Sequence, residues 1–120
     1  MGKRVLVVED SLLISSALRI LLESNEYEVE IAASAQEALD AALRSRPDVM
    51  LLDLTLPDGD GLPVLTDLAG RNARPGVTLA MTGHDDDITR ARSMAAGCSA
   101  VLVKPVPVRD LLRILSESLT

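Results

Sequence analysis

Short apolar runs alternate with helical repeats along the whole chain. The apolar runs predict strands over 5–8, 27–32, 49–52, 77–81 and 100–103. The segments between and after them carry apolar residues every three or four positions, or helix-capping residues, and predict helices over 12–22, 34–44, 63–69, 85–96 and 108–118. The pattern therefore predicts five strands that alternate with five helices.

The second predicted strand differs from the others. Its apolar residues Tyr27, Val29 and Ile31 alternate with glutamates, which is typical of a strand with one wet face at the edge of a sheet. The run over 49–52 is apolar throughout, as parallel strands covered on both faces are. Right-handed crossovers between such strands predict an α/β fold, a three-layer doubly wound parallel sheet.

Composition excludes several classes of protein. The 120 residues fit one domain over 1–120, and since the last helix ends the chain we expect no output domain in it. The lone Cys98 excludes a disulfide within the chain. No apolar run reaches the length of a membrane span or signal peptide. A net charge of −6 and 1% aromatic residues disfavour nucleic-acid binding. We expect a cytoplasmic protein without direct nucleic-acid or membrane partners.

Polar residues follow four of the five predicted strands. These residues are Glu9, Asp10, Asp53, Thr82 and Lys104. Because the carboxyl ends of parallel strands lie at one edge of the sheet, we expect these side chains to share one crevice. Each acid alone has a simpler explanation, since an acid after a strand often caps the next helix, and Asp10 or Ser11 could do only that. The combination is harder to explain by capping.

Three neighbouring carboxylates repel one another, which raises their pKa values unless a cation lies among them. Mg²⁺ suits a site with few carboxylates, because it keeps several water ligands. An ammonium from Lys104 and a hydroxyl from Thr82 suit phosphoryl oxygens. A carboxylate can itself be the nucleophile in phosphoryl transfer, and Asp53, in the middle of the sheet, is the best placed.

Four motifs together resemble the receiver domain of two-component response regulators. They are Val-Val-Glu-Asp at 7–10, Leu-Leu-Asp-Leu-Thr-Leu-Pro-Asp-Gly-Asp-Gly-Leu at 51–62, Ala-Met-Thr-Gly at 80–83 and Gly-Cys-Ser-Ala-Val-Leu-Val-Lys-Pro at 97–105. The resemblance covers essentially the whole chain. It implies a flavodoxin-like sheet with strand order 2-1-3-4-5.

The resemblance also implies a role for each matching residue. Asp53 is the expected phospho-acceptor, which takes a phosphoryl group from a phosphohistidine of a sensor histidine kinase or phosphotransfer protein. The expected Mg²⁺ ligands are Asp10, Asp53, the backbone carbonyl of Thr55 and, through water, Glu9. The Thr82 hydroxyl, the Gly83 backbone N–H and Lys104 are expected to contact the phosphoryl group. The family's Lys-Pro sequence implies a cis peptide bond before Pro105.

One position departs from the family pattern. Many receivers carry Tyr or Phe three residues before the lysine, and the ring moves inward when the threonine shifts toward the phosphoryl group. Val101 stands there in this chain. Our hypothesis is that output, to a partner or an output domain, travels instead through Thr82 and the loop after it.

The first helix presents apolar residues away from its main face, at Leu12, Leu13 and Ile20. The resemblance implies that a kinase's helical hairpin docks beside them, although single exposed leucines are common on any surface.

Two other classes of function stay open: an adaptor, and an enzyme or cofactor carrier. A phosphorylation-independent receiver-like adaptor would keep the fold without the chemistry, but all the acids and the lysine are present. Flavin binding is disfavoured, because the chain has neither aromatic residues near the strand ends to stack on the flavin nor a glycine-rich phosphate loop. A haloacid-dehalogenase-type phosphatase needs an Asp two residues after the nucleophile, where this chain has Thr55.

Overall fold

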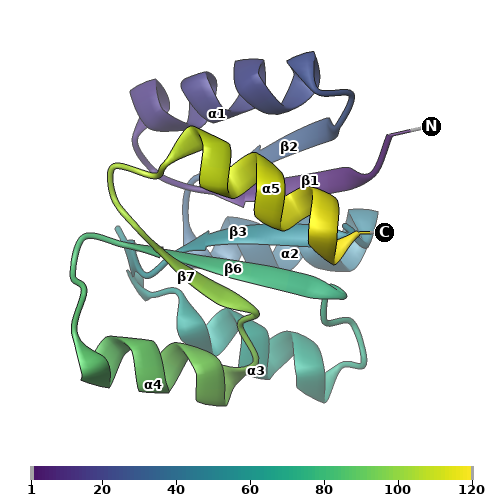
Figure 1. Cartoon of the computed structure of the whole chain (residues 1–120). Coiled ribbons are helices and arrows are strands. Elements are labelled where there is room, and N and C mark those ends of the chain that lie inside the picture. Colours follow the sequence, from purple (N-terminus) through teal and green to yellow (C-terminus); the bar gives the residue numbers. More distant parts are fainter. Residues whose placement is uncertain (1, 120) are drawn as a thin grey trace.

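A five-stranded parallel sheet runs through the centre of the molecule (Figure 1). The computed structural model describes residues 2–119. The strands of this sheet are β1 (Arg4–Val8), β2 (Glu28–Ala32), β3 (Val49–Asp53), β6 (Val77–Thr82) and β7 (Ala100–Val103). Their spatial order is β2-β1-β3-β6-β7. The predicted doubly wound fold, the order 2-1-3-4-5 and the edge position of the second strand are confirmed.

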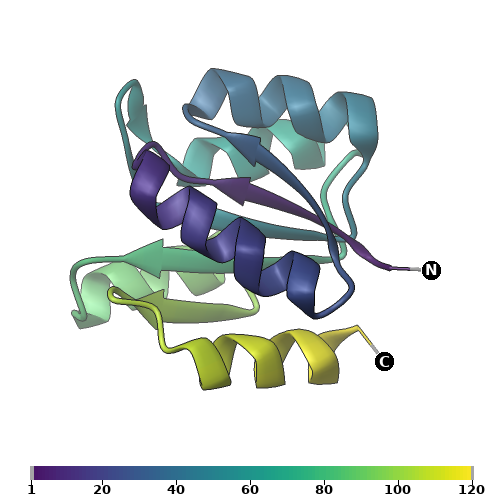
Figure 2. The same cartoon turned by 90° about the horizontal axis from the view of Figure 1, so that it is seen from above.

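Helices cover both faces of the sheet (Figure 2). They are α1 (Leu12–Ser24), α2 (Ala35–Ser45), α3 (Leu62–Gly70), α4 (Asp87–Ala96) and α5 (Val108–Ser118). Helices α1 and α5 pack with Val5, Val7 and Leu51 on one face, whereas α2 and α3, with the end of α4, pack on the other. The alternating direction of side chains along each strand separates these two halves of the core.

Side-chain caps begin three of the helices. Ser34 Oγ accepts a hydrogen bond from the Glu37 amide (3.1 Å), and Asp86 Oδ1 accepts one from the Thr89 amide (2.7 Å). Ser11 caps α1, so the capping explanation for the residues after β1 applies to Ser11 and leaves Asp10 free for another role. Gly97 ends α4 at φ 105°, a left-handed conformation that favours glycine.

A small hairpin follows β3, in a segment where the sequence pattern predicts neither a strand nor a helix. Strands β4 (Thr55–Leu56) and β5 (Gly59–Asp60) pair antiparallel around Pro57 and Asp58. Asp58 accepts hydrogen bonds from the first amides of α2, those of Ala35 (2.8 Å) and Gln36 (3.1 Å). The segment between β3 and α3 therefore contains a folded hairpin that is hydrogen-bonded to α2.

Helices α1 and α4 carry exposed apolar side chains. On α1, Leu12, Leu13 and Ile20 are 78%, 83% and 68% exposed. On α4, Ser93 is buried whereas Ile88 and Met94 are exposed. None of the helices between residues 2 and 119 combines the length and the apolar character that crossing a membrane requires.

Candidate functional site

The carboxyl ends of β1, β3 and β7 bring three charged side chains into contact. Lys104 follows β7, and its Nζ donates hydrogen bonds to Glu9 Oε1 (2.7 Å) and to Asp53 Oδ2 (2.8 Å). Glu9 and Asp53 are buried, with 1% and 3% of their surface exposed. The lysine thus neutralises part of a carboxylate pair that burial would otherwise leave without a counter-charge.

Asp10 completes a group of three carboxylates. One oxygen from each of Glu9, Asp10 and Asp53 can be chosen so that all lie within 4.8 Å of one another. Glu9 and Asp53 are at the bottom of the group, whereas Asp10 is exposed at its rim. This donor set consists of hard oxygens with one side open to solvent, which fits Mg²⁺ with several retained waters.

Burial and charge act in opposite directions on the ionisation of this group. The pKa of Glu9 is raised, because burial, the largest influence, and the charge of Asp53 together outweigh the hydrogen bonds from Lys104 and the Ser11 amide and the charge of Lys104. Burial alone lowers the pKa of Lys104, but the hydrogen bonds and charges of Asp53 and Glu9 outweigh it, so that this pKa is raised. The lysine is therefore a fixed positive charge at neutral pH.

Backbone amides hold the other oxygen of each buried carboxylate. The Thr55 amide donates to Asp53 Oδ1 (3.0 Å), and the Ser11 amide donates to Glu9 Oε2 (3.1 Å). The chain also approaches Asp53 closely at Gly61, where an added Cβ would lie 2.3 Å from the Asp53 carbonyl oxygen. The side chain and the backbone of Asp53 are both fixed by its neighbours.

Thr82 ends β6, the strand next to Asp53. Its side chain is buried, and its Oγ1 accepts a hydrogen bond from the His84 amide (3.0 Å). The Lys104 amide donates to the Thr82 carbonyl oxygen (2.7 Å), so the ends of β6 and β7 are joined. Gly83 and His84 lie exposed in the loop that leads to α4. The Lys104–Pro105 peptide bond is cis.

The comparisons with known proteins agree with this geometry. The model of the response regulator receiver domain family matches residues 5–116. The chain belongs to the response regulator receiver domain family. Receiver domains are phospho-acceptor modules of two-component signalling rather than turnover enzymes, and they typically bind Mg²⁺ through acidic residues.

Relatives and solved structures resemble this receiver domain over almost its whole length. The transcriptional regulatory protein PdtaR of Mycobacterium tuberculosis is 36% identical over 111 residues, which are 92% of this chain and 53% of PdtaR. Response regulator MprA of the same species is 37% identical over 112 residues, 93% of this chain and 48% of MprA. The chain therefore spans about half the length of these curated relatives. A CheY-like receiver domain structure from Methanospirillum hungatei has a TM-score of 0.89 at 34% identity and covers 99% of this chain and 94% of its own.

Sequence reasoning missed the supports of the receiver site. The hairpin over 55–60, the amide bonds to the two buried carboxylates and the ion pair between Asp60 and Arg92 all went unpredicted. The Asp-Gly-Asp-Gly motif over 58–61 was the available signal, because aspartates beside glycines often accept hydrogen bonds from nearby amides. Val101, at the family's aromatic position, is half-buried against the core on the α2 and α3 side.

Proposed function

We propose that this receiver domain accepts a phosphoryl group on Asp53 from a phosphohistidine of a sensor histidine kinase or phosphotransfer protein, in a Mg²⁺-dependent reaction. The observation that carries the proposal is the contact of Lys104 with Asp53 and Glu9, beside a third carboxylate at Asp10. The phosphorylated domain then changes conformation and controls a partner protein or an output domain.

In the proposed reaction, a carboxylate oxygen of Asp53 attacks phosphorus and forms an acyl phosphate. The P–N bond to the donor imidazole breaks, and the imidazole nitrogen keeps the electron pair. Lys104, the Thr82 hydroxyl and the Gly83 N–H are placed in the proposal as donors to the phosphoryl oxygens. Asp10, Asp53, the Thr55 carbonyl and, through water, Glu9 would hold Mg²⁺, which supplies positive charge to the transferred group.

Hydrolysis would return the receiver to its starting state. Attack of water on the phosphorus of the acyl phosphate releases inorganic phosphate and restores the Asp53 carboxylate. The domain would thus catalyse its own phosphorylation and dephosphorylation, with the phosphorylated protein as the signal rather than a released product.

An apolar groove beside the site suits the phosphodonor. A hollow of about 290 Å³ is lined by α1 and the segment after β7, through Leu13, Ile14, Ala17, Pro105 and Val106 among others, and it reaches Lys104. A helical hairpin that carries the phosphohistidine could bury these side chains and present its imidazole to Asp53. This placement supports the docking role that the family resemblance implies for α1.

We further propose that the signal leaves through Thr82 and the exposed loop at 83–86. Val101 has no ring to move inward, so movement of Thr82 toward a phosphoryl group would pull on its bond with the His84 amide. A comparison of the free and beryllofluoride-bound forms by NMR should show changes over 82–90. The absence of changes there would contradict this route.

The main test is incubation with acetyl phosphate, with and without Mg²⁺, followed by mass spectrometry. We expect a Mg²⁺-dependent gain of one phosphoryl group that is lost in Asp53→Asn and kept in Asp58→Asn, which changes an acid outside the site. No gain in the wild-type protein would favour the phosphorylation-independent adaptor.

A second experiment distinguishes docking of the kinase from the phosphoryl transfer at Asp53. Leu13→Glu places a charge in the groove at a side chain that is 83% exposed, so the fold should tolerate it. We expect the rate of phosphoryl transfer from a phosphorylated kinase to fall at least tenfold, which corresponds to about 1.4 kcal/mol. The rate of phosphorylation by acetyl phosphate should be unchanged. Equal slowing with both donors would show that Leu13 acts on the site itself.

A further inference from the structure

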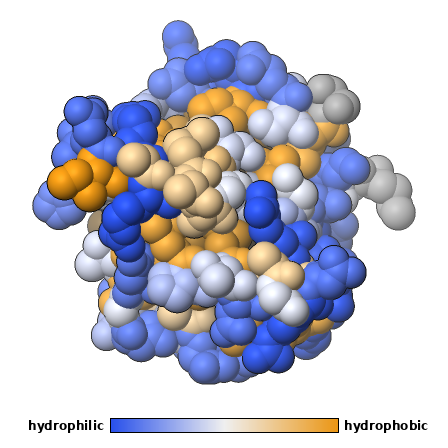
Figure 3. Space-filling model, turned by 90° about the horizontal axis from the view of Figure 1, so that it is seen from below, coloured by the Kyte–Doolittle hydropathy of each residue, from blue (hydrophilic) through white to orange (hydrophobic). Residues whose placement is uncertain are grey.

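Helix α4 is held to the rest of the molecule by few buried contacts. Ser93 is its buried residue, and its apolar side chains Ile88 and Met94 are exposed. Seen from below in the orientation of Figure 1, the surface shows hydrophobic residues interspersed with hydrophilic ones (Figure 3). A helix with so little buried surface can shift at low energetic cost. Each contact between α4 and the rest of the molecule therefore contributes to the position of the helix.

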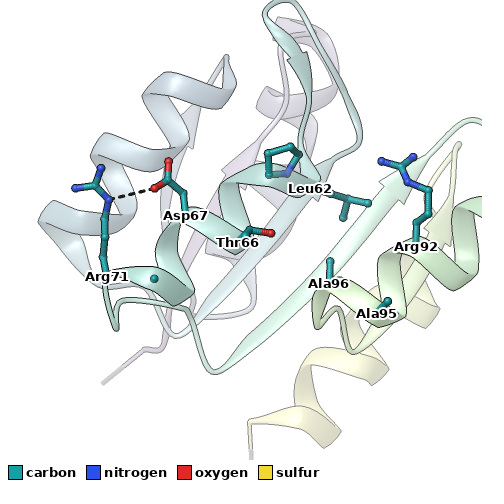
Figure 4. Close-up of a pocket in the computed structure, with 9 residues that line it drawn as sticks. Leu62, Thr66, Asp67, Arg71, Arg92, Ala95 and Ala96 are labelled. Carbon is teal, nitrogen blue, oxygen red and sulfur yellow. Dashed lines mark hydrogen bonds and ion pairs between the residues drawn. The ribbon is translucent and has the colours of Figure 1, made fainter.

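A groove of about 910 Å³ separates much of α4 from α3 (Figure 4). Arg92 stands on the α4 side, and the pair of Asp67 and Arg71 stands on the α3 side. Arg92 leaves the groove edge to form an ion pair with Asp60 of the hairpin. This pair therefore connects α4 to the segment that follows Asp53.

Asp60 is itself firmly placed. Its Oδ1 accepts a hydrogen bond from the Leu62 amide (3.0 Å) at the start of α3, while its Oδ2 meets Arg92. Across the hairpin, Asp60 pairs with Thr55. The Asp60 carboxylate thus connects α3 to α4, and the backbone of the same residue pairs with the opposite hairpin strand.

The hairpin and the residue that follows it each approach Asp53 at one point. The Thr55 amide donates to Asp53 Oδ1 (3.0 Å). Gly61, the neighbour of Asp60, lies so close to the Asp53 carbonyl oxygen that a Cβ there would be 2.3 Å from it. The backbone that pairs with Asp60 and the backbone that follows it therefore both lie close to the acceptor.

We propose that Asp60 and Arg92 are positioning residues that couple α4 to the metal and phosphoryl site through the hairpin. The inference rests on the proposed function, because it takes Asp53 and the Thr55 carbonyl to be Mg²⁺ ligands. Through the ion pair, the position of α4 sets the placement of Thr55, and the bound site in turn fixes α4. This coupling is reciprocal, so a partner that grips α4 changes Mg²⁺ affinity by the same factor that Mg²⁺ changes the affinity for the partner.

The test measures binding of Mg²⁺ alone by titration calorimetry in four proteins: the wild type, Asp60→Asn, Arg92→Met and the double variant. An exposed ion pair supports an effect of about two- to fivefold. We expect each single variant to weaken Mg²⁺ binding in that range, and the double variant to be no weaker than the singles. Hydrogen exchange in α4 and over 55–62 should rise in all three variants.

Electrostatics alone predicts a different result. Loss of the Asp60 charge would weaken Mg²⁺ binding, loss of the Arg92 charge would strengthen it, and the two effects would cancel in the double variant. That outcome overturns the proposal. Arg90→Met is the matched control, because Arg90 is an exposed arginine of the same helix that pairs with Asp85, before α4, and not with Asp60.

The two proposals fail in distinguishable ways. If Arg92→Met binds Mg²⁺ as Arg90→Met does, with unchanged hydrogen exchange, the coupling is wrong and the phosphorylation of Asp53 is unaffected. If the wild-type protein binds no Mg²⁺ and gains no phosphoryl group, the proposed function is wrong and the coupling falls with it.

Discussion

Helices α2 and α4 both touch the hairpin that follows the acceptor strand, but they are attached in different ways. Helix α2 buries Ala38, Ala41 and Ala42 against the sheet, and its first amides bond to Asp58. Helix α4 buries Ser93, and a solvent-exposed side-chain pair links it to the hairpin. Helix α2 is fixed by packing and backbone hydrogen bonds, whereas α4 is held mainly by solvent-exposed side-chain contacts. A signal that starts at Asp53 can therefore move α4 more easily than α2.

The strongest test of this contrast places the same charge on each helix. Ala42→Glu puts a carboxylate at a fully buried position of α2, whereas Ala91→Glu puts it at an exposed position of α4. We expect the first to cost about 3 kcal/mol or more in free energy of unfolding, and the second about 0.5 kcal/mol or less. Urea denaturation measures both. Losses of similar size would show that α4 is packed as tightly as α2.

A smaller effect is expected inside the core, on the sheet face shared with α2 and α3. Within residues 2–119, Thr78 Oγ1 is the buried side-chain polar atom without a hydrogen-bond partner, and Thr78 pairs with Met50 in the sheet. Thr78→Val keeps the shape and removes the hydroxyl, so we expect a gain of about 1 kcal/mol, visible as a higher Tm. Ser93→Ala is the control, because the Ser93 hydroxyl already donates to the Thr89 carbonyl (2.8 Å). A gain in Ser93→Ala that matches that of Thr78→Val would refute the explanation.

The smallest change in stability is expected from loss of the hydrogen bonds between Asp58 and the first amides of α2. Hydrogen bonds from the Ala35 and Gln36 amides lower the pKa of Asp58 below its usual value. A lowered carboxyl pKa stabilises the fold above the unfolded-state pKa, near 4, and the contribution disappears as pH falls through the lower folded-state pKa. Asp58→Ala should therefore melt below the wild type at pH 7.

The difference in Tm between Asp58→Ala and the wild type should close as the pH falls below about 4. Asp40→Ala, on the outer side of the same helix, supplies the control for loss of one surface acid. A difference that stays constant from pH 7 to pH 3 would mean that the Asp58 carboxylate is not the group responsible.

The sequence was sufficient to predict the sheet and the gathering of the charged residues. Each strand is a compact apolar run, and the polar residue directly after it lies at the sheet edge by geometry alone, so Glu9, Asp53 and Lys104 could be placed together. Helix ends such as those at Ser34 and Gly97 are also local, because each depends on residues within one helical turn.

The supports of the site depend on contacts between distant residues. Asp58 reaches amides more than twenty positions earlier, and Asp60 meets Arg92 from α4. In the sequence these aspartates look like ordinary turn residues, since turn formation and helix capping select the same side chain. The hairpin was missed for a related reason, because two residue pairs are too few to give a strand pattern.

The position of Lys104 between Glu9 and Asp53 has a consequence for how the protein folds. The buried carboxylates find their counter-ion within the chain, from a residue near its far end. A newly synthesised chain can therefore close this part of its core before it meets any metal. Assembly of the fold and binding of the metal can therefore be separate events.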